Sequence, residues 1–291
     1  MSAGDQVVYL SVGDAERRYV LHTPVGRARG PLPLVLMLDG RGGTPWTAMR
    51  STGWSRAADA AGFLVAYPEA LRLDPAAPMH FLSNPQMWNA GTGGSDVERG
   101  PVDDIAFLDA VIQDICARFG ADDERIHMAG FSNGASMTFR YAVERPARLA
   151  AMATVAGHLR VDRCEPAAGR TPLIGIYGGR DPLCPASGGH VALPWGREEI
   201  RPAAMDTVRG WAAHLGLAAT PSSVDDADGV MILRFGPGAR GEEIRTYVVA
   251  DMGHVWPGGH RLLPEGLVGP ETGKLNATAV IWDFFSSRTR G

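Results

Sequence analysis

Apolar residues gather in short uninterrupted runs along this chain, and amphipathic stretches separate the runs. Residues 34–38 read LVLML and residues 63–67 read FLVAY. Continuous runs of this length are typical of strands that are buried on both faces of a parallel sheet. Further strands of this sheet are predicted at residues 125–129, 150–156, 172–177, 230–235 and 243–249.

The N-terminal segment has a different pattern. Residues 7–12 and 17–23 are rich in residues that favour strands, and Gly13 and Asp14 lie between them. A short turn of this kind between two strand-forming runs predicts a β-hairpin.

Helical patterns fill the intervals between the buried runs. Thr44 followed by Pro45 predicts an N-cap and a first-turn proline for a helix over residues 45–61. Asp104 is expected to cap the next helix, whose apolar stripe ends at Phe119. The remaining helices are expected at residues 133–144, 202–215 and 275–286.

Buried strands that alternate with helices predict an α/β fold, with a mainly parallel sheet covered by helices on both faces. No linker or shift in composition divides the chain, so we expect a single domain over residues 1–291. Residues 69–100 and 182–201 are rich in turn-forming residues and are expected to be loop insertions above the sheet.

The composition argues against several classes of protein. With 291 residues, 21% of them charged, and a net charge of −4, neither a nucleic-acid partner nor an anionic membrane surface is expected. No run of apolar residues is long enough to span a membrane. Cys116, Cys164 and Cys184 have neither the spacing of a zinc site nor that of a disulfide framework.

The first residues of the chain show no basic stretch followed by an apolar core, which is the pattern of a signal peptide. We therefore expect a cytoplasmic protein, although a secreted form whose leader had been removed would have the same sequence. The oligomeric state has no signal in the sequence.

The strongest chemical signal is the run GFSNG at residues 130–134. The pattern G-x-S-x-G between a strand and a helix is typical of a nucleophile elbow. The two glycines permit a tight turn, and the serine would stand at a helix N-terminus, where negative charge is stabilised. This predicts Ser132 as a nucleophile, and a small-residue turn with an exposed serine is the alternative.

A serine hydroxyl needs a base, and the partners are expected at the ends of later strands. Asp181 follows the strand at residues 172–177, and His254 follows the last strand in a glycine-flanked loop. We expect Asp181 to orient His254. The competing residues are Asp225, Asp226, Asp228 and Asp251 for the acid and His260 for the base.

Two backbone amides are expected to form an oxyanion hole. Asn133 follows the nucleophile directly and is expected to give one. The loop DGRGG at residues 39–43 is expected to give the other, from Arg41 first and Gly42 second. Nucleotide binding is the alternative for this loop, but it fits neither phosphate-binding glycine pattern.

Trp88, Trp195 and Trp256 fall on loops that are expected to surround the nucleophile. We predict them as substrate-binding residues, because aromatic walls suit an apolar or aromatic acyl group. Packing of the loops themselves is the alternative role.

At this point the motifs resemble those of the α/β-hydrolase esterases known as feruloyl esterases and polyhydroxybutyrate depolymerases. The most specific match is GHVWPGG at residues 253–259, which resembles that family's GHxWPGG histidine loop. YGGRDP at residues 177–182 resembles its HGTxDP acid loop, and the matches extend from about residue 17 to 287. The resemblance implies an α/β-hydrolase fold and a triad of Ser132, Asp181 and His254, with neither a metal nor an organic cofactor.

The chain departs from this family at Asp39, where relatives usually have histidine before the glycine. A carboxylate beside an oxyanion hole would oppose the negative charge that develops there. We therefore expect Asp39 to point away from the site or to pair with an arginine, for example Arg41. Many secreted relatives carry extra cysteine pairs in the late loops, and their absence here fits a cytoplasmic protein.

Together these features predict a serine carboxylic-ester hydrolase that acts through an acyl-enzyme on a small-molecule or oligomeric ester. A phenolic ester and a hydroxyalkanoate oligomer are both compatible with the sequence. A serine peptidase or acyltransferase would use the same triad on the same fold. A hydrolase-like binding protein without activity is the other alternative, suggested by Asp39.

Overall fold

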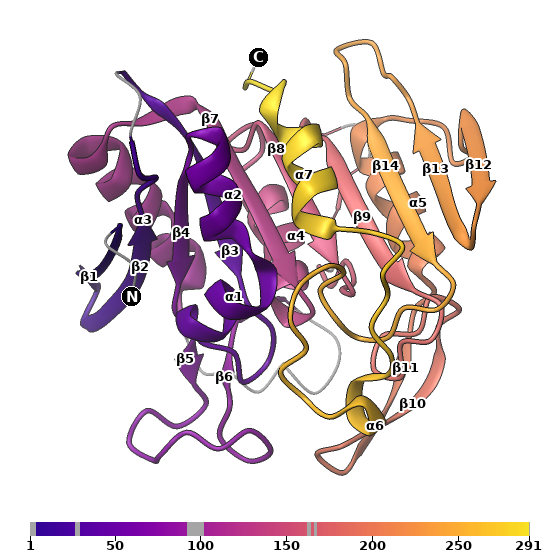
Figure 1. Ribbon diagram of the computed structural model, residues 1–291, viewed down its shortest axis with the longest axis horizontal. Coiled ribbons are helices and arrows are strands. Elements are labelled where there is room, and N and C mark those ends of the chain that lie inside the picture. Colours follow the sequence, from indigo (N-terminus) through magenta and orange to yellow (C-terminus); the bar gives the residue numbers. More distant parts are fainter. Residues whose placement is uncertain (1–3, 27–29, 92–101, 162–163, 166–167, 291) are drawn as a thin grey trace.

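A large β-sheet forms the centre of the computed structural model, which describes residues 4–26, 30–91, 102–161, 164–165 and 168–290. Its strands are β1 (Asp5–Val12), β2 (Ala15–His22), β3 (Leu32–Leu38), β4 (Leu64–Pro68), β7 (Ala121–Phe131), β8 (Ala151–Val155), β9 (Leu173–Gly178), β12 (Ser223–Ala227), β13 (Val230–Phe235) and β14 (Ile244–Val249). They form one ten-stranded sheet in the order β1-β2-β4-β3-β7-β8-β9-β14-β13-β12 (Figure 1). Because one sheet takes strands from most of the chain, we propose that the chain forms one domain.

The middle of the sheet is parallel, from β4 through β3, β7, β8 and β9 to β14. Along β3, Leu34 and Leu36 face one side, and Val35 and Met37 face the other, all fully buried. This explains the unbroken apolar run, since both faces of the strand are covered. The edges are antiparallel, with β2 against β4 and β13 against β14. The expected mainly parallel sheet is confirmed.

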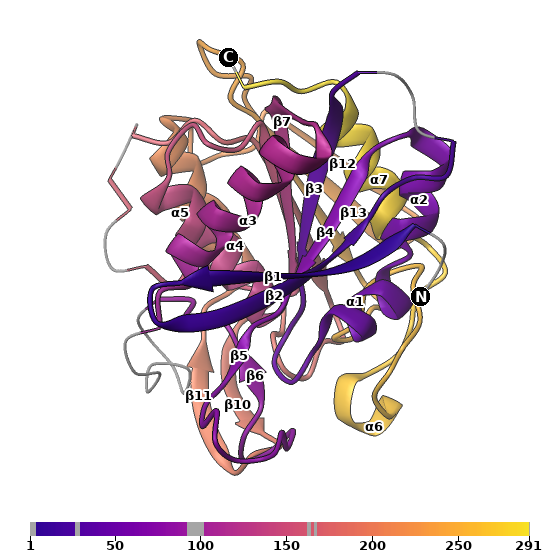
Figure 2. The same ribbon diagram turned by 90° about the vertical axis from the view of Figure 1, so that its left-hand side faces the viewer.

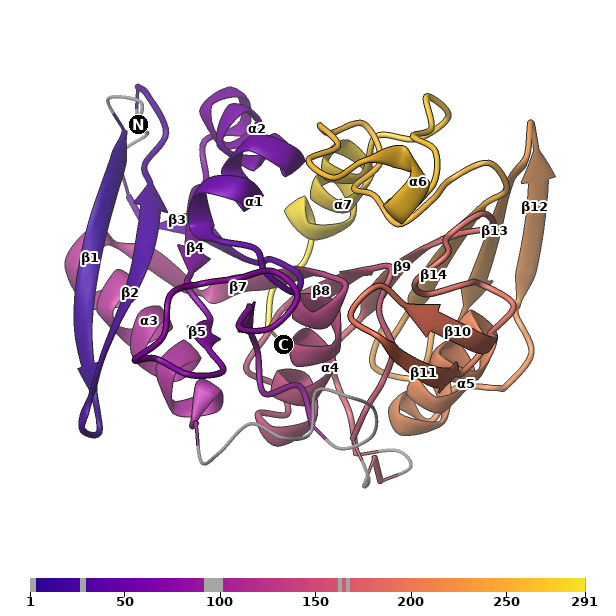
Figure 3. The same cartoon turned by 90° about the horizontal axis from the view of Figure 1, so that it is seen from below.

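Helices cover both faces of the sheet, as predicted. Figure 3, which looks along the sheet, shows three helices on one side: α3 (Asp104–Phe119), α4 (Asn133–Glu144) and α5 (Ala204–Leu215). The other side carries α1 (Pro45–Thr52), α2 (Trp54–Ala61) and α7 (Ala277–Ser286). Each set of helices packs on its own buried apolar cluster. This three-layer arrangement is the α/β-hydrolase fold.

The single helix predicted over residues 45–61 is wrong, because the structure has two helices there. Thr44 caps α1 as expected, but Gly53 has φ 73°, a left-handed conformation that ends α1 and precedes α2. Glycine adopts this conformation without a steric penalty. Gly53 itself is the signal in the sequence for this break, since glycine commonly follows the last residue of a helix.

The two predicted loop insertions contain strands. Residues 182–201 include an antiparallel hairpin of β10 (Gly189–Leu193) and β11 (Arg197–Arg201). The first insertion contains β5 (Leu71–Arg72) and β6 (Gln86–Met87), and its residues 92–101 lie outside the described part. Both insertions and the short helix α6 (Glu265–Val268) project from the same edge of the sheet (Figure 1).

Among the described residues, none of the helices combines the length and the apolar character that a membrane crossing requires.

A buried ion pair joins the N-terminal hairpin to α3. Arg17 Nη2 donates to Asp104 Oδ1 at 2.8 Å, and neither side chain is more than 2% exposed. The other carboxylate oxygen of Asp104 accepts from the Asn89 amide at 2.7 Å. Figure 2 looks onto the hairpin at this edge of the sheet, with α3 beside it. Asp104 therefore holds together three segments that are distant in the sequence.

Asp104 was expected to cap α3, but the cap is its neighbour Asp103. The exposed side chain of Asp103 accepts from the Ala106 amide at 2.8 Å. The sequence pattern could not separate these adjacent aspartates, because either spacing satisfies the cap.

The different contacts of Asp104 and Asp103 predict that replacing Asp104 destabilises the fold more than replacing Asp103. Asp104→Ala leaves the buried Arg17 guanidinium without its partner and should lower the free energy of unfolding by about 3–5 kcal/mol. The matched variant Asp103→Ala removes only a helix cap and should cost about 1 kcal/mol. Urea denaturation of both variants measures the two values, and equal losses or the reverse order would contradict the structure.

Candidate active site

Ser132 stands in a turn that leads from β7 directly into α4. Its backbone has φ 53° and ψ −116°, a conformation that is strained for any residue except glycine. A Cβ atom on Gly130 would lie 2.3 Å from the Gly134 carbonyl oxygen, and one on Gly134 would lie 2.2 Å from the Leu38 carbonyl oxygen. Both positions therefore require glycine. The amide of Ser132 donates to the Val155 carbonyl at 2.9 Å, which fixes the turn against β8.

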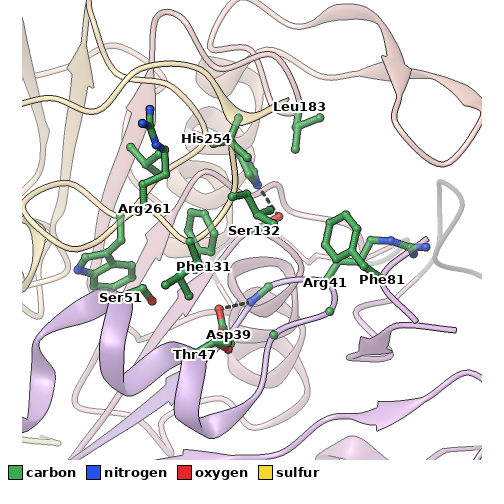
Figure 4. Close-up of a pocket in the computed structure, with 18 of the residues that line it drawn as sticks. Asp39, Arg41, Thr47, Ser51, Phe81, Phe131, Ser132, Leu183, His254 and Arg261 are labelled. Carbon is green, nitrogen blue, oxygen red and sulfur yellow. Dashed lines mark hydrogen bonds between the residues drawn. The ribbon is translucent and has the colours of Figure 1, made fainter. Parts of the chain in front are cut away.

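The side chains of Ser132, His254 and Asp181 form a continuous hydrogen-bonded chain. His254 Nε2 lies 2.8 Å from Ser132 Oγ, and His254 Nδ1 lies 2.8 Å from Asp181 Oδ2 (Figure 4 draws the first contact). The Asp181 carboxylate can only accept, so the ring proton belongs on Nδ1. Nε2 is then left as the acceptor for the Ser132 hydroxyl. The structure thus brings together the three residues that the sequence singled out.

Backbone contacts orient both partners of the serine. Asp181 is buried, and its Oδ1 accepts from the amides of Leu183 at 2.8 Å and Cys184 at 2.7 Å. The His254 loop is held against residues that follow α6, since the Gly253 amide donates to the Pro270 carbonyl at 2.8 Å. A Cβ on Gly253 would lie 2.4 Å from the Val268 carbonyl oxygen, which explains the glycine before the histidine.

The competing acids lie elsewhere, and the competing histidine lines the cavity beside Ser132 but is not the histidine of the hydrogen-bonded chain. Asp225 is on the exposed edge strand β12, where it pairs with Arg234, and Asp226 and Asp228 are also exposed. Asp251 accepts from the Thr272 hydroxyl at 2.9 Å and lies 3.5 Å from Lys274. The exposed His260 is held by its amide, which donates to the Ser51 carbonyl at 3.0 Å.

The glycine-rich loop after β3 passes directly beside the nucleophile. A Cβ on Gly40 would lie 3.0 Å from the Ser132 Cβ. The Gly42 amide donates to the Gln86 carbonyl at 2.8 Å, so it is already occupied. This hydrogen bond argues against Gly42 as an oxyanion donor and leaves Arg41 as the candidate from this loop.

A cavity opens beside Ser132 and His254. Its walls are mainly apolar (Figure 4), and they include Phe81, Phe131, Leu183, Trp195, Trp256 and Val268. Within the described ranges, no group of three or more histidine, cysteine or carboxylate side chains is placed to hold a metal ion.

Comparison with protein families places the chain among esterases. Residues 17–165 match the family described as esterase PHB depolymerase. The chain belongs to this family. It is accordingly an ester-hydrolysing enzyme, and the resemblance noted in the sequence is confirmed.

Individual relatives agree with the family. The esterase is 28% identical over 288 residues to a protein described as an esterase, NocK of Nocardia uniformis subsp. tsuyamanensis, covering 94% of this chain and 80% of that protein. It is 31% identical over 107 residues to feruloyl esterase C of Emericella nidulans, covering 36% of this chain and 37% of that one. A solved structure of acetyl xylan esterase from Aspergillus awamori has a TM-score of 0.62 at 14% identity, covering 97% and 99% of the two chains. This last likeness shows a shared fold.

The three predicted substrate-binding tryptophans have different positions in the esterase. Trp195 and Trp256 line the apolar cavity. Trp88 does not, because its indole is buried in the core, stacks on Phe107 and donates to the Asp39 carbonyl at 3.1 Å. The prediction for Trp88 is therefore wrong, and its role is to hold the loop that carries Asp39.

The side chain of Asn133 has a role that the sequence did not reveal. Its Oδ1 accepts from the Trp88 amide at 2.7 Å, and its Nδ2 donates to the Trp88 carbonyl at 3.2 Å. These two bonds fasten the segment around Trp88 to the nucleophile turn. The only signal in the sequence was the joint presence of WNAG at residues 88–91 and the asparagine in GFSNG.

Asp39 is held by its own loop and by α1. Its carboxylate accepts from the Gly40 amide at 2.8 Å and from the Thr47 hydroxyl at 2.6 Å, beside which Figure 4 shows it. The sequence suggests Arg41 as a partner of Asp39. The guanidinium carbon of Arg41 lies over the Trp195 ring, 4.3 Å from the ring centroid. Burial raises the pKa of Asp39 to about 6, and the two hydrogen bonds lower it less.

The raised pKa of Asp39 predicts a pH-dependent stability. Since the folded protein holds this proton up to about pH 6 and the unfolded chain releases it near pH 4, folding loses stability as pH rises through this interval. Asp39→Asn removes the charge and should raise the free energy of unfolding at pH 8 by up to about 3 kcal/mol. The asparagine oxygen can still accept from the Gly40 amide. The asparagine NH₂ group can donate to the Thr47 hydroxyl oxygen, because that hydroxyl can donate its own proton to the Thr44 carbonyl.

Thermal or urea unfolding at pH 4 and pH 8 measures this effect. At pH 4 the variant and the parent should have the same stability, which is the internal control. A variant that is less stable than the parent at pH 8 would show that the charged form of Asp39 stabilises the fold.

Proposed function

We propose that this esterase is a serine carboxylic-ester hydrolase in which Ser132, His254 and Asp181 form the catalytic triad. Ser132 Oγ attacks the ester carbonyl carbon while His254 Nε2 takes the hydroxyl proton. His254 then gives that proton to the departing alcohol, which leaves an acyl group on Ser132. Water, deprotonated by the same nitrogen, attacks the acyl carbon and releases the carboxylic acid. Asp181 holds the ring and stabilises the imidazolium that forms.

The backbone amides of Arg41 and Asn133 are the proposed oxyanion donors. Asn133 is the first residue of α4, so its amide belongs to the positive end of the helix. Arg41 follows Gly40, whose close approach to Ser132 brings this loop within reach of the reacting carbon. Two donors that are fixed in advance stabilise the tetrahedral intermediate without reorganisation.

The observation that carries the proposal is the hydrogen-bonded chain from Ser132 through His254 to Asp181, with each contact at 2.8 Å. The apolar cavity supports esters that have one aliphatic or aromatic part. The names of the relatives, which include feruloyl and acetyl xylan esterases, point to the same range of carboxylic esters.

The triad predicts the effect of two histidine variants and a serine variant. Ser132→Ala and His254→Ala should each lower kcat on p-nitrophenyl acetate and butyrate by at least about 10⁴-fold, since each removes a group that acts with the others. His190→Ala, at an exposed histidine on β10 that does not line the apolar cavity, is the matched control and should change kcat by less than about threefold, because surface changes outside the reacting groups have small effects. Ser132→Ala should also abolish labelling by a fluorophosphonate probe. Turnover retained in Ser132→Ala would refute the proposal, and cleavage of the matching p-nitroanilides would favour a peptidase.

The proposed role of Asp181 in the triad is tested by replacing its carboxylate with an amide. In Asp181→Asn the oxygen stays with the Leu183 and Cys184 amides, so the new NH₂ group must face His254 Nδ1. This forces the ring proton onto Nε2, which can then no longer accept from Ser132, and kcat should fall by about 10³–10⁴-fold. Asp251→Asn, the matched change at the rival acid, should leave kcat within about threefold because its effect is confined to the surface. Equal activity of the two variants would remove Asp181 from the triad.

A further inference from the structure

Ser132 lies between two cavities of opposite chemistry. Besides the apolar cavity, a second, smaller one is lined by Arg41, Arg160, Arg201 and His158, together with Ser132 and the first turn of α4. We call it the basic cavity. Ser132, Arg41 and Trp195 line both cavities, so the proposed nucleophile stands at their junction.

Three arginines of the described residues line the basic cavity. Arg201, at the end of β11, lies 3.1 Å from Glu199, and Arg160 lies 3.8 Å from the same carboxylate oxygen. Arg41 is the third arginine that lines the cavity. An anion inside this cavity would lie beside positively charged side chains.

Two buried side chains of the basic cavity have ring or guanidinium nitrogens without a hydrogen-bond partner among the described residues. Arg201 is 6% exposed, and its Nε is buried without a hydrogen bond. His158 is 1% exposed, and neither of its ring nitrogens has a hydrogen bond. Buried polar groups are nearly always satisfied, so two such side chains in one cavity indicate that a ligand completes them.

The protonation of His158 suits this role. Burial and the neighbouring Arg160 lower the pKa of His158 to about 4, so its ring is neutral at neutral pH and carries one N–H. That N–H can donate to an anion beside the arginines. Asn133 and Ser136, in the first turn of α4, place the positive end of this helix at the same cavity.

We propose that the basic cavity binds a carboxylate carried by the acyl part of the ester, so that the substrate is a monoester of a dicarboxylic acid. Guanidinium groups match a planar carboxylate through paired hydrogen bonds. The acyl side follows from the proposed mechanism, on which this inference rests. His254 must protonate the departing alcohol, and His254 lines the apolar cavity but not the basic one. The alcohol therefore occupies the apolar cavity, and the acyl chain extends to the arginines.

Two matched esters test the charge directly. Monophenyl adipate carries a terminal carboxylate, and phenyl adipamate is its neutral analogue of the same shape, so the ratio of their kcat/KM values isolates the charge. We expect the anionic ester to be preferred by about tenfold or more, as for other charge-assisted hydrogen bonds. Added salt should reduce the preference. A ratio near or below one would overturn the inference, whereas failure to hydrolyse either ester would overturn the proposed function instead.

A second pair of esters tests the side on which the carboxylate binds. In 4-acetoxybenzoate the carboxylate lies on the alcohol part, and its methyl ester is the neutral match. We expect no preference for the anion in this pair. A preference here that exceeds the one for monophenyl adipate would overturn the placement on the acyl side.

Variants of the β10–β11 hairpin test whether the preference for the anionic ester depends on the basic cavity. Arg201→Gln should bring the ratio for the adipate pair to within about twofold of one, because the buried charge is lost. Arg201→Lys keeps the charge without the paired geometry and should retain part of the preference. Arg197→Gln removes the same charge from an exposed position on the same strand and should keep the full ratio. An unchanged ratio in Arg201→Gln, or in Arg160→Gln should Arg201→Gln fail to fold, would overturn the inference.

Discussion

The close approach of backbone segments around Ser132 is the constraint on which the rest of this structure depends. The Leu38 carbonyl at the end of β3, the turn after β7 and the start of α4 meet with no room for a Cβ at Gly130 or Gly134. This contact places the glycine-rich loop after β3 against the nucleophile turn. It also compels the strained, positive-φ backbone of Ser132 and aims the first amides of α4 at the same point. One steric condition thus positions both the proposed nucleophile and the proposed oxyanion donors.

The partners of Ser132 reach it because the middle of the sheet is parallel. Asp181 and His254 are 73 residues apart, and Ser132 and His254 are 122 residues apart. Asp181 follows β9 and His254 follows β14. These strands are neighbours in the sheet, so the two loops leave from adjacent carboxyl ends. The loops also touch, since a Cβ on Gly178 would lie 2.3 Å from the Met252 carbonyl oxygen. Sheet order therefore turns a large separation in sequence into a hydrogen bond.

The sequence predicted those features that depend on local sterics and on strand periodicity. GFSNG, the residues after each buried run and the alternation of strands with helices all act within a few residues, and the structure matches them. Features that depend on the whole fold were missed. The burial of Trp88 and of His158 results from contacts with distant segments, which apolar patterns do not encode. The roles of Asp103 and Asp104 are features of the same kind. Asp103 caps α3 and Asp104 pairs with Arg17 of β2, and the packing of β2 against α3 decides which aspartate takes which role.

The replacement of the family's usual histidine by Asp39 becomes understandable when the two sides of Ser132 are considered together. A carboxylate near an oxyanion would oppose the reaction if its charge were uncompensated. Burial raises the pKa of Asp39 to about 6, so the side chain is still largely charged at neutral pH, and the Gly40 amide and the Thr47 hydroxyl bind that charge on the side of α1. Arg41, Arg160 and Arg201 line the basic cavity next to Ser132. Positive side chains there and the N-terminus of α4 favour developing negative charge. The same groups would stabilise the oxyanion and attract a substrate carboxylate, so tolerance of Asp39 and the proposed selectivity for an anionic acyl group have a common electrostatic cause.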